Sequence, residues 1–482
     1  MKFTNSYIHL GDLFYEKIHP QAVANPEIFL WNDALADELN VQEQLEPEEL
    51  AQIFSGNHLL PGSEPLALAY AGHQFGNFVP QLGDGRAHLL GEVIDQNGNR
   101  KDIQLKGSGQ TRFSRNGDGR CAFGPAIREF IMSEAMYALG IPTTRSLAVT
   151  TTGESVFRET LQPGAVVTRV ASSHLRVGTF QYFAAQGNYQ AIEQLCDYAI
   201  KRHYPELKEA GGQRFKELLK AVIDQQTRLV VEWLRVGFIH GVMNTDNTSI
   251  AGETIDYGPC AMLGVYDHQT VYSSIDVQGR YAFGNQPTIA QWNMARLAET
   301  LLPLIHPEEE KAIEIASSLV DEFSERFQAR YIAMMAAKTG LANPDENDYQ
   351  LVSEFQNLLE DKQLDYTITF NALTQSLSSE QAEQHMRNNA EDWYQRWINR
   401  IDALTENRSA IQNSMQQVNP VVIPRNHHVE NVIDSCIQSA DPQAAIEFIE
   451  VLKSPYAETI STRLYQDAPA NGDTDYKTFC GT

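Results

Sequence analysis

The chain has 482 residues, of which 42% are hydrophobic, and a formal net charge of −25. Its length suggests roughly two to four domain-sized units. So acidic a chain repels phosphate, which excludes nucleic acid as a general partner. No run of about eighteen apolar residues is present to span a membrane. The start MKFTNSYIHLGDLF lacks the features of a secretion signal, so we expect a cytoplasmic protein.

The cysteines argue against a zinc-built or disulfide-built scaffold, because they are scattered and form no C-x-x-C pair. Their odd number leaves at least one thiol free or externally paired. We expect the last of them, close to the C-terminus, to be a free thiol in a reducing compartment. The five are Cys121, Cys196, Cys260, Cys436 and Cys480.

The first segment, residues 1–66, is expected to be an extension of helix and loop packed on the main body. Residues 25–40 and 46–56 both show acidic first turns and apolar residues at helical spacing.

Residues 67–180 contain short β-like runs broken by glycine, with one helix among them. The helix is predicted to begin near Pro125 and to stop at Gly140, because these residues suit a helix start and a C-terminal cap. The strand-like runs cover residues 88–95, 101–107, 146–157 and 164–171.

The remaining chain is mainly helical and divides into residues 181–286 and 287–482. Within the former, FIHGVMNTDNTSIAGETIDYGP is loop-like, and we expect a hairpin around Gly252-Glu253 that brings Asn247 near Asp256. A small strand-rich lobe followed by a larger helical lobe is the order of a protein kinase. We therefore predict an α+β, protein-kinase-like two-lobed fold with helical extensions at both ends.

The loop carries an altered kinase motif, because a kinase has H-R-D, four residues and Asn, then D-F-G. His240 is present, but Val242 stands where the proton-accepting Asp belongs. Asn247 occupies the position of the metal-binding Asn, and Asp256 begins a D-Y-G. Asp246 adds a carboxylate beside Asn247. We predict Asp246 as the proton acceptor and Asn247 and Asp256 as ligands of Mg²⁺ or Mn²⁺.

Lys106 ends a strand-like run, as the phosphate-pairing lysine of a kinase does. Its ammonium requires a carboxylate, for which Glu129 is the first choice and Glu134 the second. The alternative is a surface lysine without contact to either glutamate.

Two glycine-containing turns are candidate nucleotide contacts. Gly83, Gly85 and Arg86 stand where a kinase has its glycine loop, although an ordinary tight turn explains the glycines equally well. Arg86 would crowd an adenine beneath the loop but pair with phosphate, so we expect a reversed nucleotide. Asp118 and Gly119 are predicted to contact the base or ribose, the alternative being a mobile surface loop.

Arg169 and Arg176 lie near the junction of the predicted lobes. We expect both to converge on a triphosphate, because guanidinium groups bind phosphate oxygens as charged forks.

Three other histidines are assigned structural roles. His427 and His428 are adjacent, so their side chains are expected to point apart, and neither has a carboxylate or cysteine at useful spacing. His73 is expected to be a hydrogen-bonded structural residue.

Five blocks in this order resemble the selenoprotein O family of pseudokinase-fold protein adenylyltransferases. They are AYAGHQFGNFVPQLGDGRAHLLGEV, LKGSGQTRFSRNGDGR, IREFIMSEAMYALGIPTTRSL, VVTRVASSHLRVGTFQ and HGVMNTDNTSIAGETIDYGP. The resemblance implies that ATP binds reversed and that AMP passes to Ser, Thr or Tyr hydroxyls of proteins, with pyrophosphate released.

The resemblance also implies roles for individual residues. The proton acceptor falls on Asp246 and the metal ligands on Asn247 and Asp256. Cys480 matches a cysteine or selenocysteine near the family's C-terminus. This match leaves a redox-sensitive bridge with an unnamed partner open, while a free thiol remains the expectation. The nucleotide contacts fall on Gly83, Gly85, Arg86, Lys106, Asp118, Gly119, Arg169 and Arg176.

Two alternatives use the same cleft. One is a conventional kinase, with the γ-phosphate facing the acceptor, and the other is a non-catalytic ATP-binding scaffold. The sequence leaves open the acceptor proteins, the choice between ATP and UTP, and the oligomeric state, for which a monomer is one option.

Overall fold

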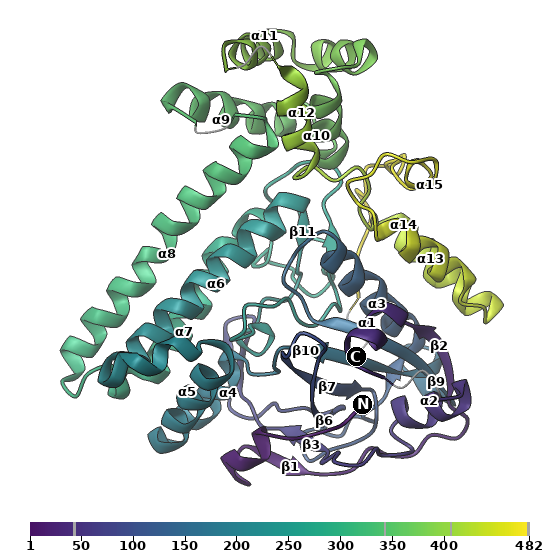
Figure 1. Ribbon diagram of the computed structural model, residues 1–482, viewed down its shortest axis with the longest axis vertical. Coiled ribbons are helices and arrows are strands. Elements are labelled where there is room, and N and C mark those ends of the chain that lie inside the picture. The colour runs from purple at the N-terminus through teal and green to yellow at the C-terminus, as the bar shows by residue number, and fades with distance from the viewer. Residues whose placement is uncertain (42–44, 342–343, 405–406, 480–482) are drawn as a thin grey trace.

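A computed structural model describes residues 1–41, 45–341, 344–404 and 407–479 of the protein. Figure 1 shows a strand-rich part at the lower right, with long helices to the left of it and further helices at the top. The N-terminal part is built around an antiparallel sheet and the C-terminal part is helical. The predicted α+β class is therefore confirmed. Cys480 lies outside the described residues.

The main sheet has eight strands, in the order β1, β3, β6, β7, β10, β9, β2, with β8 paired to β10. Its described pairings are all antiparallel. The four strand-like runs of the sequence are confirmed as β6, β7, β9 and β10. The strands are β1 (Tyr15–Lys17), β2 (Glu27–Trp31), β3 (Leu66–Leu68), β6 (Ala87–Ile94), β7 (Arg100–Lys106), β8 (Cys121–Ala122), β9 (Arg145–Phe157) and β10 (Leu161–Ala171). Two further pairs lie outside this sheet, β4 (Gly72–Gln74) with β5 (Asn77–Val79) and β11 (Phe238–Ile239) with β12 (Ala261–Met262).

Helices cover both faces of the sheet. On one face, α1 (Asp33–Glu38) and α2 (Pro47–Phe54) share an apolar cluster with β6, β7, β9 and β10. On the other face, α3 (Phe123–Ala138) contributes to the largest apolar cluster, which continues into the helical part. The predicted helix is thus present, although it begins two residues before Pro125. It ends as expected, because Gly140 takes a φ of +80° just beyond it.

The helical part consists of three groups. The first packs beside the sheet and contains α4 (Val177–Ala184), α5 (Tyr189–His203), α6 (Arg214–Val236), α7 (Gln286–Ile305) and α8 (Glu309–Lys338). The second, at the top of Figure 1, contains α9 (Glu346–Asp361), α10 (Tyr366–Gln375), α11 (Glu380–Leu404) and α12 (Arg408–Gln416), and most of its buried side chains belong to a separate apolar cluster. The third contains α13 (Asn426–Ser439), α14 (Gln443–Leu452) and α15 (Ile460–Arg463), of which α13 and α14 contact α3.

Two local expectations are wrong. Residues 27–31, expected to be helical, form strand β2, because β9 offers them a ladder of backbone partners. The expected hairpin around Gly252 is absent. Ser249 instead bridges to Arg176, and Thr254 bridges to Thr143. An isolated short hairpin is only marginally stable, so this segment pairs with the segments that contain Arg176 and Thr143 instead.

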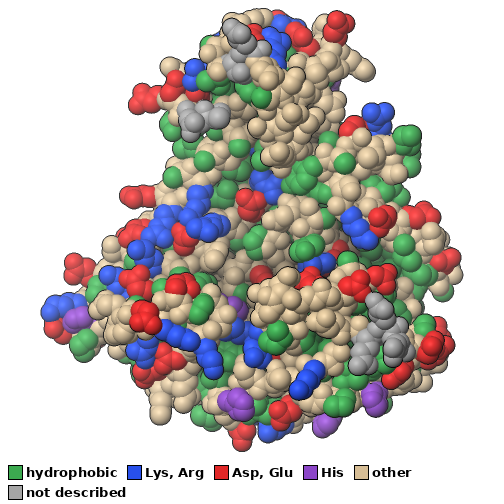
Figure 2. Space-filling view, in the orientation of Figure 1, with side chains coloured by type: hydrophobic (Ala, Val, Ile, Leu, Met, Phe, Trp, Pro, Cys, Tyr) green, Lys and Arg blue, Asp and Glu red, His purple; other side chains and the backbone are tan. Residues whose placement is uncertain are grey.

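None of the helices in the described ranges combines the length and apolar character needed to cross a bilayer. Figure 2 shows acidic and basic side chains mixed on one face of the molecule. Many of the charged side chains form ion pairs. For example, Arg228, Arg326 and Arg330 all contact Asp224.

Candidate active site

Four charged side chains meet between the sheet and α3. The Lys106 Nζ lies 2.6 Å from Glu129 Oε2 and 2.9 Å from Asp256 Oδ1. The Arg169 guanidinium contacts Glu129 and lies 2.8 Å from Asp256 Oδ1. Three of these side chains are almost completely buried, whereas that of Asp256 is 23% exposed. We call these four residues the charge cluster.

Strand alternation explains why the two cations meet. In the ladder between β7 and β10, Lys106 stands opposite Val167 and Gln104 opposite Arg169. Residues two apart share one face of a strand, so Lys106 and Arg169 both point toward α3. The intervening Leu105 points to the other face and packs in the cluster with α1 and α2. The helix then supplies Glu129, the first of the two predicted carboxylates.

Glu134, the second choice, lies elsewhere on α3. It accepts hydrogen bonds from Arg145 Nε at 2.8 Å and Arg145 Nη2 at 2.6 Å. It also accepts one from Asn32 at 2.7 Å. Glu134 therefore fastens α3 to β9 and to the start of α1.

The cluster fixes the ionisation of its carboxylates. Burial alone would raise the pKa of Glu129, but Arg169 and Lys106 hold it below its ordinary value. Burial opposes ionisation of Asp256 too, yet Lys106 and Arg169 lower its pKa far below the usual range. Two carboxylates face two cations, so the buried group is neutral overall. Removal of one member leaves an uncompensated buried charge.

Asp256 has an unusual backbone, with a φ of +68°. A non-glycine residue in this region is uncommon and persists only where its surroundings hold it. His240, which is buried, contributes to this support, because its Nε2 lies 3.1 Å from the carbonyl oxygen of Ile255. Lys106 and Arg169 hold the side chain from the other end. The D-Y-G turn thus presents Asp256 in one fixed position.

Asp246 is buried where the loop that contains it packs against α4. A Cβ on Gly72 would come within 2.4 Å of its Oδ1, and one on Gly178 within 3.4 Å of its Cα. Its Oδ1 has no hydrogen-bond partner among the described residues, and Oδ2 has only a long contact of 3.5 Å with Gln74. Burial raises the pKa of Asp246 to about 6, although Arg176 opposes the rise. A buried carboxylate with a free oxygen is suited to take up a proton.

Asn247 lies beside Asp246 in a 3₁₀ turn, Thr245–Asn247. Its Nδ2 donates to the carbonyl oxygen of Val242 at 3.1 Å, which directs Oδ1 the other way. The contacts of Asp256 with Lys106 and Arg169 both use Oδ1. One amide oxygen and one carboxylate oxygen are thus left for a cation, and this donor set fits Mg²⁺ or Mn²⁺. Asn247 also lines a very small pocket of about 10 Å³.

The glycine loop packs against residues 113 and 114. Gly83 has a φ of +77°, and a Cβ there would lie 2.3 Å from the ring of Phe113. A Cβ on Gly85 would lie 2.7 Å from the carbonyl oxygen of Phe113. Close packing therefore explains both glycines without a phosphate. Arg86 follows them and lines the large cavity described below.

Asp118 and Gly119 lie in an irregular segment beside Arg158, which lines the same cavity. Asp118 is paired with Arg158, whose Nη1 lies 2.7 Å from its Oδ2. Burial would raise the pKa of Asp118, but Arg158 and the backbone N–H of Arg120 lower it. Gly119 has a φ of +69°, and a Cβ there would clash with the backbone of Gly109 at 2.2 Å. The segment is therefore tied to the protein rather than a loose surface loop.

Arg176 is buried away from the charge cluster. Its Nη1 donates to the backbone carbonyl of Asp246 at 3.1 Å, and its guanidinium lies 4.5 Å from the centre of the Tyr70 ring. Asp84 is 4.0 Å from its Nη2, which lacks a hydrogen-bond partner among the described residues. The structure thus brings Arg169, and not Arg176, to the charge cluster. Arg176 supports the loop that carries Asp246.

A cavity of about 1000 Å³ opens beside the charge cluster. Lys106, Glu129 and Asp256 line it together with Arg86. Its size suits a nucleotide, since ligand pockets commonly enclose about 300–1,000 Å³. Its lining also includes residues that the sequence did not indicate, among them Arg128, Arg158, Glu430, Asp475, Tyr476, Lys477 and Phe479.

Comparison with known proteins shows the family to which the chain belongs. Residues 1–453 match the family model described as Protein adenylyltransferase SelO. The chain belongs to the SelO family. A Protein nucleotidyltransferase YdiU from Teredinibacter turnerae is 55% identical over 485 residues, covering 100% of both chains. The protein of that name from Pseudoalteromonas translucida is 51% identical over 482 residues and covers 100% of both. Another, from Geobacillus kaustophilus, is 50% identical over 484 residues, covering 100% of this chain and 99% of the relative. The predicted family is confirmed.

In this SelO-family chain the C-terminal tail forms part of the cavity wall. The hydroxyl of Tyr476 donates to Glu430 at 2.6 Å and accepts a hydrogen bond from Arg128 at 3.3 Å. Arg128 itself contacts Glu430 and precedes Glu129 on α3. The tail residues carry no motif. They are held at the cavity because Tyr476 contacts Glu430 on α13, which packs on α3, and because Thr478 bridges to Ser273.

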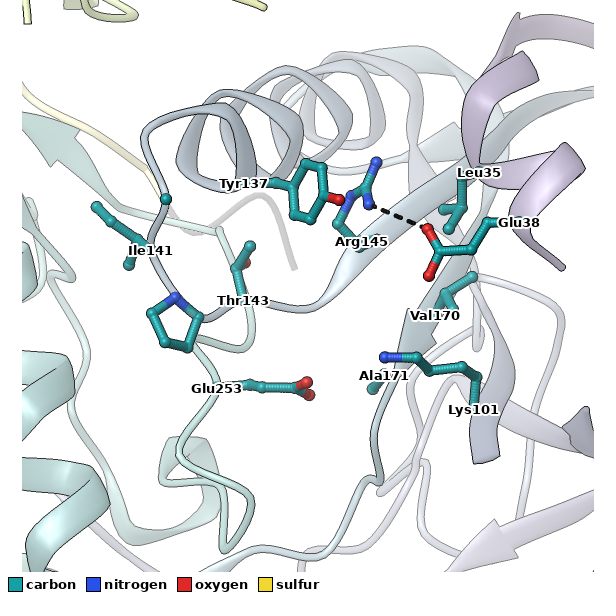
Figure 3. A pocket seen from close by; sticks show the side chains of 12 residues that line it. Leu35, Glu38, Lys101, Tyr137, Ile141, Thr143, Arg145, Val170, Ala171 and Glu253 are labelled. Atoms are coloured by element: carbon teal, nitrogen blue, oxygen red, sulfur yellow. Dashed lines mark ion pairs between the residues drawn. The ribbon is translucent and has the colours of Figure 1, made fainter. Parts of the chain in front are cut away.

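A second pocket of the SelO-family chain, of about 280 Å³, lies between α1, the end of α3 and the end of β10 (Figure 3). Lys101 and Glu253 point into it, and Glu38 faces Arg145 at one side. No described member of the charge cluster lines it. The pocket is therefore separate from the candidate active site.

Proposed function

We propose that the protein transfers AMP from ATP to Ser, Thr or Tyr hydroxyls of other proteins and releases pyrophosphate. Membership of the SelO family and the names of its relatives as protein nucleotidyltransferases support nucleotidyl transfer. The observation that carries the proposal is the charge cluster at the wall of a nucleotide-sized cavity. We further propose that the α+β fold is of the protein-kinase type, with lobes at residues 67–180 and 181–286 flanked by segments 1–66 and 287–482.

In this proposal the cations of the cavity bind the phosphates of ATP. Lys106 is held by Glu129, so its ammonium group enters the reaction already oriented. Arg86 adds charge in the lining of the cavity, and Arg169 adds charge from its contact with Asp256 behind it; both would stabilise the departing pyrophosphate. Gly83, Gly85, Asp118, Gly119 and Arg176 complete the proposed nucleotide site. An ATP molecule bound in reverse would direct its α-phosphorus toward the acceptor.

Asp246 is proposed as the proton acceptor. Its raised pKa of about 6 is close to neutral pH, where a general base works best. Gln74, on strand β4, lies 3.5 Å from the carboxylate oxygen Oδ2 of Asp246. Asp246 would thereby take the role of the kinase Asp that Val242 replaces, from a position four residues further along the chain.

The oxygens of Asn247 and Asp256 would hold a Mg²⁺ or Mn²⁺ ion. When bound, such an ion supplies Lewis-acid stabilisation of the phosphate charge. The φ of +68° at Asp256 and the amide of Asn247 tied to Val242 keep both donors in place before substrate arrives.

ATP labelled at the α- or the γ-phosphorus tests the reaction. The protein and a mixture of candidate acceptors are incubated with each label and Mg²⁺ or Mn²⁺, and protein-bound label is measured. We expect only the α-label to be incorporated. Incorporation of the γ-label alone would establish a conventional kinase, and binding of ATP without either incorporation would indicate a scaffold.

A further inference from the structure

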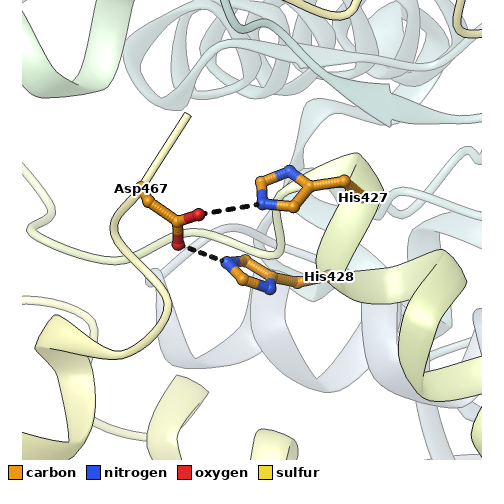
Figure 4. A group of neighbouring side chains, drawn as sticks. All are labelled: His427, His428 and Asp467. Carbon is orange, nitrogen blue, oxygen red and sulfur yellow. Dashed lines mark hydrogen bonds and ion pairs between the residues drawn. The ribbon is translucent and has the colours of Figure 1, made fainter. Parts of the chain in front are cut away.

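His427, His428 and Asp467 converge near the start of α13, far along the chain from the catalytic loop. Figure 4 shows both imidazole rings directed at one carboxylate, which comes from the segment after α15. The His428 Nε2 lies 2.9 Å from Asp467 Oδ1, and the His427 Nε2 lies 3.6 Å from Asp467 Oδ2. The expectation that the two side chains point apart without a carboxylate partner is therefore wrong. Both rings rotate to one side, with centroids 4.0 Å apart.

We propose that these three residues form a binding site for a divalent transition-metal ion of the Zn²⁺ class. Two imidazoles and a carboxylate are a donor set that such ions prefer. In the described part of the chain, this is the group whose ligand atoms all lie within 4.8 Å of one another. The site is distinct from the Asn247 and Asp256 pair.

The distances suit a metal ion better than a network of hydrogen bonds. Tetrahedral ligands about 2.05 Å from zinc are about 3.3 Å from one another. The separations of 2.9 and 3.6 Å from Asp467 lie on either side of this value. The longer of them exceeds a normal hydrogen bond. A small shift of the Asp467 side chain, which is 65% exposed, would equalise them.

His427 gives an independent indication. Its two ring nitrogens are buried and neither has a hydrogen-bond partner among the described residues. A buried imidazole without a partner is costly, whereas metal ligation would satisfy Nε2.

The surroundings hold the ligands without opposing a cation. The ring of His428 packs 5.0 Å from that of Tyr465 and 6.2 Å from that of Phe448, which limits its motion. Arg425, the nearest guanidinium in sequence, is neutralised by Asp365 at 2.8 Å. Asp473 lies close enough to His427 to affect its pKa and adds negative charge.

The site would fasten the C-terminal tail. Asp467 precedes the segment that carries Tyr476 to the wall of the large cavity. A metal ion that joins Asp467 to α13 therefore shortens the free length of this tail. We expect metal binding to slow hydrogen exchange in residues 464–478.

The test uses full-length, tag-free protein that has been freed of metal with a chelator. Zn²⁺ is titrated calorimetrically in excess Mg²⁺, which occupies the proposed catalytic site, for the wild type, Asp467→Asn and His427→Asn. His427→Asn removes no hydrogen bond, so it tests the site even if Asp467→Asn disturbs folding. Asp434→Asn, which removes an exposed carboxylate from the same helix, is the matched control.

We expect the wild type and the control to bind one Zn²⁺ that both site variants bind at least about 100-fold more weakly. On addition of Zn²⁺, hydrogen exchange of residues 464–478 should slow in the wild type and in Asp434→Asn but not in Asp467→Asn or His427→Asn. Equal Zn²⁺ affinity in His427→Asn and the wild type would overturn the proposal. The cluster would then be only a hydrogen-bonded pair of His428 and Asp467. This assay measures no adenylyl transfer, so its outcome is independent of the proposed function.

Discussion

Replacement of Asp246 by Asn should stabilise the folded protein while it abolishes the proposed reaction. The pKa of Asp246 is about 6 in the folded protein, against an ordinary value of 3.8. Between these values the folded state retains a proton that the unfolded state has released. The stability of the wild type therefore falls as the pH rises from 3.8 to 6, and the full penalty of the buried charge applies above pH 6.

The size of the effect follows from the two pKa values. Their difference corresponds to about 3 kcal/mol at pH 7.5, and to about 1 kcal/mol at pH 4.5, where most of the folded protein holds the proton. Asn has nearly the same shape and no charge, so it avoids this penalty at every pH. We expect Asp246→Asn to be more stable than the wild type by about 3 kcal/mol at pH 7.5 and by about 1 kcal/mol at pH 4.5.

Thermal and urea denaturation at the two pH values measure the difference, with Asp434→Asn as the exposed-carboxylate control. The control should remain within about 0.5 kcal/mol of the wild type. Transfer activity of Asp246→Asn should fall on the order of 10²–10⁴-fold. If Asp246→Asn were no more stable than the wild type at pH 7.5, the argument that burial of Asp246 is costly would be refuted.

Three further predictions concern the same site. Glu129→Gln leaves an excess positive charge in the charge cluster and should cost about 3–5 kcal/mol in urea denaturation, and a cost below about 1 kcal/mol would contradict the buried pairing. Gly83→Ala should lower both the melting temperature and the affinity for ATP. The added Cβ would lie 2.3 Å from the ring of Phe113, and residue 83 has a φ of +77°. An unchanged melting temperature would show that the loop can move. The transfer rate should fall about tenfold from pH 7 to pH 5 as Asp246 takes up its proton, and a rate that is constant over this range would exclude it as the base with this pKa.

Much of the fold was predictable because it depends on local patterns. Short β-like runs at residues 101–107 and 164–171 identified β7 and β10, and Pro125 and Gly140 identified the approximate ends of α3. The register between β7 and β10, which the sequence does not give, then places Lys106 and Arg169 on one face of the sheet, where both meet Glu129. The site roles of these residues remain proposals.

The failures concern segments whose partners are distant in the chain. Residues 27–31 became a strand because β9 lies beside them, and the segment around Gly252 gave up its hairpin for bridges to Arg176 and Thr143. The secondary-structure propensity of a segment does not include the hydrogen bonds that distant segments offer it, and these hydrogen bonds decided its conformation here.

The sequence by itself determined the family, the strands β6, β7, β9 and β10 with helix α3, and the residue types of the loop at residues 238–259. The tertiary structure decided that Arg169 joins the charge cluster while Arg176 supports the loop, and that Asp467 meets His427 and His428. It also decided that the tail borders the cavity. The physical reason is that motifs and periodicity act over a few residues, whereas contacts between distant segments depend on how complete elements pack.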